Sequence, residues 1–429
     1  MPAVVDREVG HGGNTRRPPG LDLQVSTTTR SPAREARATH PALVIVALAL
    51  GGFSIGTTEF VTMGLLQEIA DGIGETIPRT GHIISAYAFG VVVGAPLIVA
   101  ACARLPRKAL AVGLVVAIAI GNAATALADG YPQLMGARFL AGLPHGAYFG
   151  VASLLAASVV GPERRGRAVA GVMLGLSVAT VAGVPASTWL GQNLGWRAAY
   201  WLVVVLAVLT VALVLAVVPS RPGNPDATVR AELGALASPQ VLFAVAAGMI
   251  GFGGVFALYS YVSPLATNVT GVALSSVPWF LLAFGVGSVV GSWLAGMLSD
   301  WDVERTVLGG FAVLVGVLVA SWWLTPTVVG ALVTVFVVGV LGSVLAIGLQ
   351  IRLMNEAGEA EMLGAALNHS SLNVANGLGA AVGSVVIAGG LGYRAPGVVG
   401  AALAALGLGI FLVALTVQRR ARTVVPTRP

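Results

Sequence analysis

The sequence predicts an all-α membrane protein of twelve transmembrane helices, arranged as two parallel repeats of six. Three observations predict this class: the composition, the spacing of the apolar runs and an internal repeat. Of the 429 residues, 56% are hydrophobic and only 10% are charged, and the mean hydropathy is +0.88. Soluble globular domains carry about 25% charged residues. The composition therefore excludes that class and places the chain in a lipid bilayer.

Twelve apolar runs are long enough to cross the bilayer. A membrane-spanning helix needs about 20 mostly apolar residues, and runs of that length alternate here with short polar segments. Because twelve is an even number, both termini are expected on the same side of the membrane. The expected spans are 43–66, 81–103, 109–128, 134–158, 168–191, 199–219, 241–265, 277–298, 307–325, 329–352, 363–388 and 397–418.

The positive charges indicate the orientation, because Lys and Arg collect in short cytoplasmic loops. Twenty of the 24 Lys and Arg residues lie in the two tails and the alternate loops that share their side. The other side carries only Arg79, Arg197 and Arg394, and Arg138 lies inside a span. We therefore expect cytoplasmic N- and C-termini. The net charge of +6 follows from this sidedness, so it does not indicate a nucleic-acid partner.

Polar segments divide the chain. Residues 1–42 are Arg-rich and lack the apolar core of a signal peptide, so we expect a disordered cytoplasmic tail; an organellar transit peptide is the alternative. Residues 220–240 contain three prolines and are the expected cytoplasmic linker. The linker separates an N-terminal bundle, 43–219, from a C-terminal bundle, 241–418. A second cytoplasmic tail, 419–429, follows.

The two sets of six spans resemble each other at a fixed offset of 197 residues. GWRA at 195–198 recurs as GYRA at 392–395. Six spans separate the copies, so the repeats are parallel, an arrangement typical of secondary transporters that rock two halves around a central site. Four glycines, namely Gly90, Gly94, Gly142 and Gly161, map by the same offset onto Gly287, Gly291, Gly339 and Gly358.

No motif for another energy source is found. A phosphate-binding GxxxxGK[ST] loop needs a Gly-Lys pair, but the single lysine, Lys108, follows Arg107. Neither a metal-ligand cluster nor a Ser, His and Asp set for hydrolysis is apparent. We therefore predict a protein that is not an enzyme, has no cofactor and is driven by an ion gradient.

Glu59 is the strongest candidate for a proton site. It is the one residue of the 18 Asp and Glu that we place inside a span. A charged side chain at bilayer depth costs at least about 2.5 to 3.5 kcal/mol, so such residues usually face a cavity or a partner. A static ion pair or a protonated structural carboxyl is the alternative.

Arg138 and His145 lie seven residues apart in the fourth span, on one helix face with Gly142. At about 1.5 Å per residue, Glu59, Arg138 and His145 lie roughly 24, 30 and 20 Å from the cytoplasmic ends of their spans. The three side chains therefore share one layer. We expect Arg138 to hold Glu59 ionised while a proton or the substrate competes for that contact. A fixed clamp between helices for Arg138, and a packing role for His145, are the alternatives.

Three segments chiefly carry a resemblance to a known family, namely TTEFVTMGLLQEIA, ARFLAGLPHGAYFG and LGAALNHSSLNVANGLGAAVG. Through them the chain beyond its N-tail resembles the major facilitator superfamily, in the drug:proton antiporter branch. Within that branch it is similar to the arabinose-efflux-type and chloramphenicol-exporter-type permeases. The resemblance implies that spans 1, 4, 7 and 10 line the cavity, with 3, 6, 9 and 12 outermost. It also implies that Glu59 and Arg138 occupy the positions of the branch's first-span acid and fourth-span arginine.

Two motifs of the resemblance concern conformational change. GVP at 183–185 resembles the antiporters' fifth-span motif, which makes Gly183 and Pro185 a candidate flexing element. The superfamily's GxLxDRxGRK loop survives as VAACARLPRK at 99–108, which keeps Arg104 and Arg107 but lacks the Asp. The second-half copy keeps Asp300, so we expect Asp300 and Arg305 to form the remaining latch; ordinary solvated loop charges are the alternative.

The eleventh span carries a polar stripe of His369, Asn373 and Asn376, whereas the equivalent residues of the first half are apolar. Such asymmetry between repeats indicates a binding site, although polar contacts between helices would explain it as well. Further candidates for an amphipathic pocket are Tyr87, Tyr148, Phe149, Tyr259, Tyr261, Trp279 and Gln350. Packing or interface anchoring is the alternative for the aromatic ones.

Together these observations predict a secondary transporter that exports a small amphipathic drug-like compound or sugar derivative in exchange for protons, by alternating access. Its partners would be the substrate, protons and the lipid bilayer, with no nucleic acid. We expect a monomer in the plasma membrane of a bacterium. An uptake symporter of a sugar or nucleoside, or a non-transporting sensor on the same fold, is the alternative, because the direction comes from the resemblance alone.

Overall fold

The structure is a computed structural model that describes residues 40–75, 77–223, 234, 237–273 and 276–424. Nearly all of the expected N-tail, most of the linker 220–240 and the last residues of the C-tail therefore lie outside the described residues. The helices described below all belong to one unit, Thr39–Pro429.

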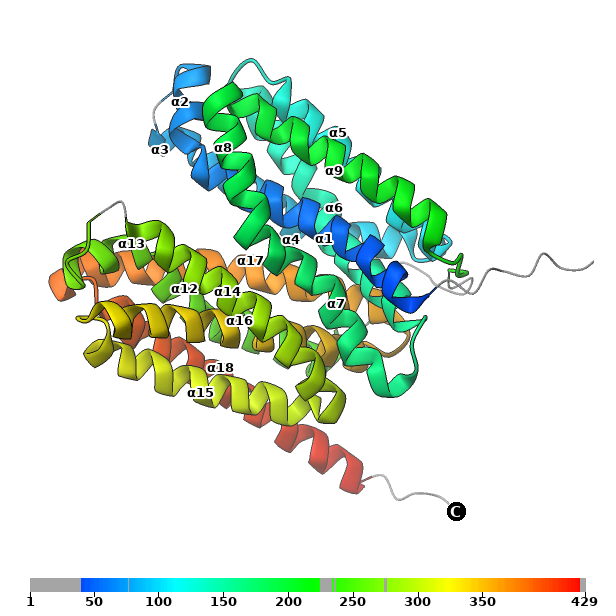
Figure 1. Ribbon diagram of the computed structural model, residues 1–429. Helices are drawn as coiled ribbons and strands as arrows, with labels where there is room; N and C mark the ends of the chain where they lie inside the picture. Colours follow the sequence, from blue (N-terminus) through cyan, green and yellow to red (C-terminus); the bar gives the residue numbers. More distant parts are fainter. Residues whose placement is uncertain (1–39, 76, 224–233, 235–236, 274–275, 425–429) are drawn as a thin grey trace, which may run out of the picture. The chain divides into compact units, whose positions relative to one another are not determined.

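The described residues contain twelve helices long and apolar enough to cross a membrane, which confirms the predicted number. The first six spans are built from α1 (Pro41–Gly64), α4 (His82–Cys102), α5 (Arg107–Ala126), α6 (Tyr131–Ala157), the run α7 (Arg165–Val178), η2 (Ala179–Gly183) and α8 (Val184–Leu194), and α9 (Trp196–Val217) (Figure 1). Short helices between them are α2 (Leu66–Ile73), α3 (Ile77–Thr80) and η1 (Pro162–Arg164).

The second six spans follow the same plan. They are built from α11 (Pro239–Gly251) with α12 (Gly253–Tyr259), α14 (Val277–Trp301), α15 (Val303–Leu324), α16 (Val328–Glu356), α17 (Glu361–Val386) and α18 (Ala395–Val424) (Figure 1). The short elements are α13 (Val262–Pro264), η4 (Leu265–Val269), η6 (Gly358–Ala360) and η7 (Ile387–Leu391).

The fifth and eleventh spans are longer than expected. They cover Pro162–Leu194 and Gly358–Leu391, against the expected 168–191 and 363–388. Each begins with a 3-10 turn and includes a π-helical turn, η2 or η7. In the fifth span, η2 ends at Gly183, and Pro185 lies in the first turn of α8. Because proline has no N–H to donate, the local change of helix type accommodates it.

The internal repeat is visible in how the helices pack. A Cβ added to Gly142 would lie 2.2 Å from the Tyr87 carbonyl oxygen, where α6 crosses α4. A Cβ on Gly339 would lie 2.3 Å from the Phe284 oxygen, where α16 crosses α14. Both members of each contact are related by the offset of 197, so the two crossings are equivalent. Only glycine permits so close an approach of backbones.

The repeated GWRA and GYRA sequences form equivalent corners. Gly195 and Gly392 have φ of +91° and +76°, which favours glycine. Two residues later, Arg197 donates to the carbonyl of Ala128 and Arg394 to that of Trp322, so each arginine ties a corner to the end of a neighbouring span.

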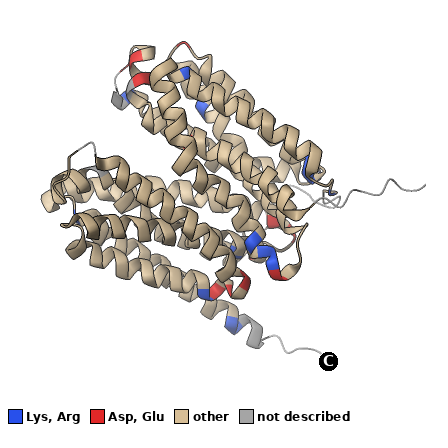
Figure 2. Ribbon diagram, in the orientation of Figure 1, with Lys and Arg blue, Asp and Glu red and all other residues tan. Residues whose placement is uncertain are grey.

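Charged residues lie mainly at the helix ends (Figure 2). One end of the spans, here called the arginine-rich end, carries Arg104, Arg107, Lys108, Arg164, Arg165, Arg167, Arg221, Arg305 and Arg352. The opposite end carries Arg79, Arg197 and Arg394. Which end faces the cytoplasm stays a prediction.

The two sets of six spans pack against each other chiefly toward the arginine-rich end. One apolar core there contains Leu155 and Val169 from the first half together with Ile347 and Leu363 from the second. Helix α7 packs on α14, and α17 packs on both α4 and α6.

The predicted pairing of Asp300 with Arg305 is wrong. Asp300 accepts hydrogen bonds from the backbone N–H groups of Gly166 (2.6 Å) and Arg167 (3.3 Å), and its carboxylate lies 3.1 Å from Arg167 Nε. Arg305 instead pairs with Asp302 at 3.2 Å. The start of α7 supplies free N–H groups and a cation to Asp300, whereas Asp302 caps α15 and takes up Arg305 locally.

The other loop arginines also lie at this end. Arg107 directs Nη1 toward Met362 Sδ at 3.6 Å and therefore contacts the second half, and Arg104 is exposed. A second ion pair between the halves joins Arg165 to Glu361 at 3.0 Å.

Candidate functional site in a cavity between the two halves

A cavity lies between the two halves, on the side of their contact away from the arginine-rich end. The cavity has a volume of about 910 Å³, which includes the space at its open mouth. Its lining residues come from spans 1, 4, 5, 7, 8, 10 and 11, and among the described residues none comes from spans 3, 6, 9 or 12. The walls therefore include the four spans that the resemblance implies, and also three that it does not.

Glu59 lines the cavity from α1 and is half-buried. Among the described side chains, no ion pair within 4.0 Å joins it to a basic group. Arg138 is nevertheless within electrostatic reach of it. Glu59 is thus a carboxyl group in contact with the cavity and beside a buried cation.

The direct contact expected between Arg138 and Glu59 is not formed. Arg138 is fully buried, and it donates to Thr58 Oγ1 at 3.0 Å and to the Thr58 carbonyl at 3.1 Å. Its guanidinium also lies 4.4 Å from the centre of the Tyr87 ring. Thr58 in turn donates to Asn122 Oδ1 at 2.5 Å. The arginine is therefore fixed to the residue that precedes Glu59 in the chain.

His145 and His369 meet across the two halves. His145 Nε2 on α6 lies 3.2 Å from His369 Nδ1 on α17, and His145 Nδ1 lies 3.0 Å from the Tyr87 hydroxyl. Both histidines line the cavity. Tyr87, on α4, is buried and is not among the described lining residues of the cavity. Its hydroxyl group contacts His145, which does line the cavity.

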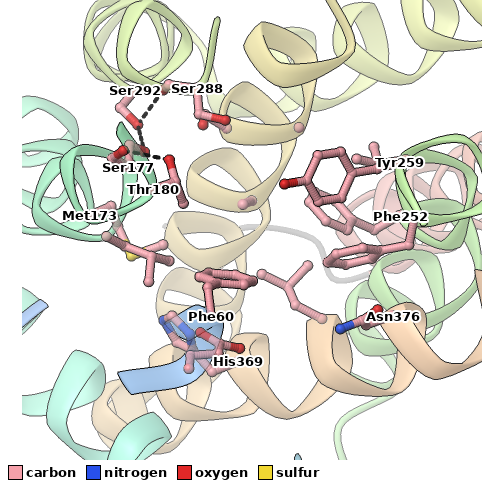
Figure 3. A pocket seen from close by; sticks show the side chains of 18 of the residues that line it. Phe60, Met173, Ser177, Thr180, Phe252, Tyr259, Ser288, Ser292, His369 and Asn376 are labelled. Atoms are coloured by element: carbon pink, nitrogen blue, oxygen red, sulfur yellow. Dashed lines mark hydrogen bonds between the residues drawn. The ribbon is translucent and has the colours of Figure 1, made fainter. Parts of the chain in front are cut away.

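Hydroxyl groups line one side of the cavity and aromatic rings the other (Figure 3). Ser177 on α7 and Ser292 on α14 are hydrogen-bonded across the halves at 2.8 Å, with Thr180 and Ser288 beside them. Across the cavity, Tyr259 stacks on Phe284 with ring centres 3.9 Å apart, near Phe252. Such a surface suits a ligand with one polar and one apolar side.

The polar stripe of the eleventh span faces this cavity. His369, Asn373 and Asn376 all line it, as does Tyr259. Asn373 donates to the carbonyl of His369 within α17 at 3.0 Å. Four of the ten candidate residues for the pocket and two of the three predicted proton-coupling residues are thus brought together in one cavity.

The remaining candidates lie elsewhere. Tyr148 is buried and donates to the Leu48 carbonyl at 2.7 Å, and Phe149 stacks behind His369 with ring centres 4.2 Å apart. Gln350 donates to Ser153 Oγ at 2.6 Å. These two residues are related by the offset of 197, so equivalent positions meet between the halves. Tyr261 donates to the carbonyl of Ala380, and Trp279 is 66% exposed on the outer surface.

Sequence reasoning missed the hydroxyl side of the cavity and the Thr58 and Asn122 contacts. Comparison of the two repeats could have found the Thr58 and Asn122 contacts. At the offset of 197, the residues equivalent to Thr58, Asn122 and Arg138 are the apolar Val255, Val319 and Val335. A polar cluster present in one repeat and absent from the other indicates function. The same offset relates Ser177, Ser288 and Ser292 to apolar residues, namely Val374, Val91 and Ala95. Single serines are common in packed membrane helices, so that difference alone does not single them out.

Twelve spans in two equivalent halves, with a mixed polar and apolar cavity between them, define a multi-pass membrane transport protein. A family model described as Major Facilitator Superfamily matches residues 48–368. The chain belongs to the major facilitator superfamily.

Known relatives are similar over nearly their whole length. The chain is 38% identical to the inner membrane transport protein YdhP of Escherichia coli K12, over 89% of this chain and 97% of that one. It is 35% identical to a chloramphenicol resistance protein of Streptomyces lividans, over 90% and 97%. Among solved structures, the E. coli fucose:proton symporter FucP matches with a TM-score of 0.70 and 14% identity, over 87% of this chain and 98% of that one, which shows a shared fold.

Proposed function

We propose that this protein exports a small amphipathic compound across a bacterial inner membrane in exchange for protons. The observation that carries the proposal is the position of Glu59. It is the acidic residue among the described lining residues of the cavity, and a buried arginine lies within electrostatic reach. A carboxyl group in this position gains or loses a charge as it releases or binds a proton. That change of charge inside the cavity couples the movement of protons to the movement of the compound.

The driving force is sufficient for such an exchange. One charge that crosses a potential of 100 mV supplies about 2.3 kcal/mol, and each tenfold uphill step in an uncharged solute costs about 1.4 kcal/mol. One proton therefore supports a modest gradient of the substrate.

Export is favoured by two observations. The relative that is 35% identical is named a chloramphenicol resistance protein, and resistance is a consequence of export. The excess of Lys and Arg at one end supports placing that end, with both termini, in the cytoplasm. On this assignment the cavity opens away from the cytoplasm and is poised to take up protons and release the compound.

The cavity supports an amphipathic substrate. Hydroxyl groups of Ser177, Ser292 and Thr180 face the aromatic side formed by Tyr259 and Phe252, and the amides of Asn373 and Asn376 extend the polar surface. Phenicols, sugar derivatives and nucleosides each combine hydroxyl groups with a flat or apolar part.

Proton flux in inside-out vesicles tests the proposal. Vesicles acidified inside are given phenicols, other drugs, sugars or nucleosides, and the internal pH is followed with a fluorescent probe. Antiport dissipates the pH gradient when a substrate is added, whereas symport increases it. We expect dissipation with the wild type and at least a tenfold slower response with Glu59→Gln.

Glu163→Gln is the matched control, because Glu163 is exposed in η1 and lies outside the cavity. Its response should equal that of the wild type. An increased gradient would contradict export, and an undiminished response in Glu59→Gln would contradict the role of that carboxyl group.

A further inference from the structure

The two buried histidines form a hydrogen bond that depends on contact between the halves. His145 belongs to the first half and His369 to the second, and their exposed fractions are 1% and 3%. Nε2 of His145 and Nδ1 of His369 are 3.2 Å apart, and the ring centres are 5.1 Å apart. His369 Nε2 is buried and has no hydrogen-bond partner among the described residues. The pair therefore has one unused nitrogen, which is on His369.

This geometry limits how many protons the pair holds. A hydrogen bond between two imidazoles needs an N–H on one ring and a bare nitrogen on the other. If both rings were fully protonated, two N–H groups would face each other at 3.2 Å, and two cations would lie side by side. The bond between the halves is therefore incompatible with two protonated histidines.

The surroundings do not compensate a second positive charge. The titratable groups that contact the pair or share the cavity with it are Tyr87 on α4, Glu59 on α1 and Tyr259 on α12, and Arg138 on α6 lies over the Tyr87 ring. Of these, only Tyr87 is hydrogen-bonded to the pair. Beyond them, Arg107, Arg165 and Glu361 lie at the arginine-rich end. Phe149 covers one face of His369.

The pair lies at the boundary between the cavity and the sealed arginine-rich end. Farther toward that end, Gly146 packs against Ala366 and Gly150 against Met362, so α6 and α17 are in close contact. If the halves rock apart at this end, α6 and α17 separate, the bond between the histidines breaks and both rings become accessible to water.

We propose that His145 and His369 form a proton-binding site that takes up its full complement of protons only when the halves are apart at the arginine-rich end. In water an imidazole binds a proton near pH 6.5. The open state then binds more protons than the closed state, so acid favours opening by up to about tenfold per pH unit for each histidine below that pH. Above about pH 7.5 both states hold the same number of protons, and the effect vanishes. The proposal requires opening at this end and does not depend on Glu59.

Distance measurements between spin labels test this site without any substrate. Labels are placed at Glu163→Cys in η1 and Glu359→Cys in η6, two exposed residues of opposite halves at the arginine-rich end, in a Cys102→Ser background. Distances are recorded in nanodiscs from pH 8.0 to 5.5. We expect the ratio of separated to closed molecules to rise about tenfold to a hundredfold, with the rise beginning near pH 6.5 and continuing toward lower pH.

Variants separate this site from other titrating groups. The rise should disappear in the double variant His145→Gln with His369→Gln, and the slope of His369→Gln alone should be smaller than that of the wild type. His82→Gln is the matched control, because His82 is exposed at the opposite end and also contacts a tyrosine, Tyr131, at 3.0 Å. Glu59→Gln should keep the full response even if it abolishes transport.

Two results would overturn the proposal. One is a distance distribution in the wild type that does not change with pH. The other is an unchanged rise in the double variant, or, if that variant does not fold, an unchanged slope in His369→Gln. The carboxyl groups of the ion pairs at this end are also present in the double histidine variant, so a rise that they produced would remain there.

Discussion

At the scale of single residues, Arg138 shows how a cation is kept in the interior of a membrane protein. A charge at this depth is costly unless it is paired or hydrogen-bonded. Two groups of Thr58 accept its hydrogen bonds, and the Tyr87 ring offers a cation–π contact. These interactions use the planar, forked geometry of guanidinium, which lysine lacks.

We therefore expect Arg138→Lys to be destabilising even though it keeps the charge. Loss of at least one charged hydrogen bond and of the ring contact should cost about 2 to 3 kcal/mol, visible as a lower melting temperature in detergent. Arg79→Lys is the matched control, because that arginine is 57% exposed. Equal melting temperatures for the two variants would show that the guanidinium geometry is unimportant.

At the scale of elements, the equivalent crossings α4 with α6 and α14 with α16 depend on glycine. A Cβ on Gly94 would lie 2.1 Å from the Leu143 carbonyl oxygen, and one on Gly291 would lie 2.3 Å from that of Val340. In each case the obstacle is backbone, so only movement of a whole helix can relieve it. The duplicated glycines are thus explained by packing, without any role in binding.

Gly94→Ala and Gly291→Ala should accordingly destabilise the protein by similar amounts, about 1 to 3 kcal/mol each, the usual cost of overpacking. In contrast, Gly113→Ala on α5 and Gly316→Ala on α15 meet no atom within 4 Å and should be neutral or stabilising. Thermal unfolding of the four variants measures this difference. Similar losses at all four positions would indicate that helix packing is not the reason.

At the scale of the whole molecule, the arginine-rich end is sealed by contacts that the two repeats do not share. Asp300 binds the start of α7, whereas its equivalent in the first half is Ala103, which has no charge to offer the second half. The additional pair of Arg165 with Glu361 has no equivalent either. Of the two carboxylates in these contacts, Asp300 is the more deeply buried, with its side chain 7% exposed against 34% for Glu361.

Asp300→Asn should make this end open more often, because the amide keeps an acceptor for Gly166 but loses the ion pair with the exposed Arg167. We expect an effect of about 1 kcal/mol, or about fivefold in the equilibrium. The readout is the rate at which a maleimide labels Ser153→Cys, an isosteric change at a fully buried contact between the halves, in a Cys102→Ser background.

Arg305→Gln is the control for this measurement, because Arg305 pairs with Asp302 inside the second half. The labelling rate of Ser153→Cys in the Arg305→Gln variant should equal the rate in the protein that keeps both Arg305 and Asp300. Faster labelling in Arg305→Gln as well as in Asp300→Asn would favour the pairing expected from the sequence. An unchanged rate in Asp300→Asn would contradict the role of Asp300 in closing this end.

The sequence by itself determined the twelve spans, their repeat and the family, because hydropathy, the length of apolar runs and a fixed offset are local properties that survive any packing. It also placed Glu59 and His145 at a common depth, since depth follows from counting residues along a helix. Only the tertiary structure decided the partners: Thr58 for Arg138, Arg167 for Asp300 and His369 for His145. A partner depends on how each helix is rotated and tilted against its neighbours, and these angles are set by the contacts of the folded chain as a whole.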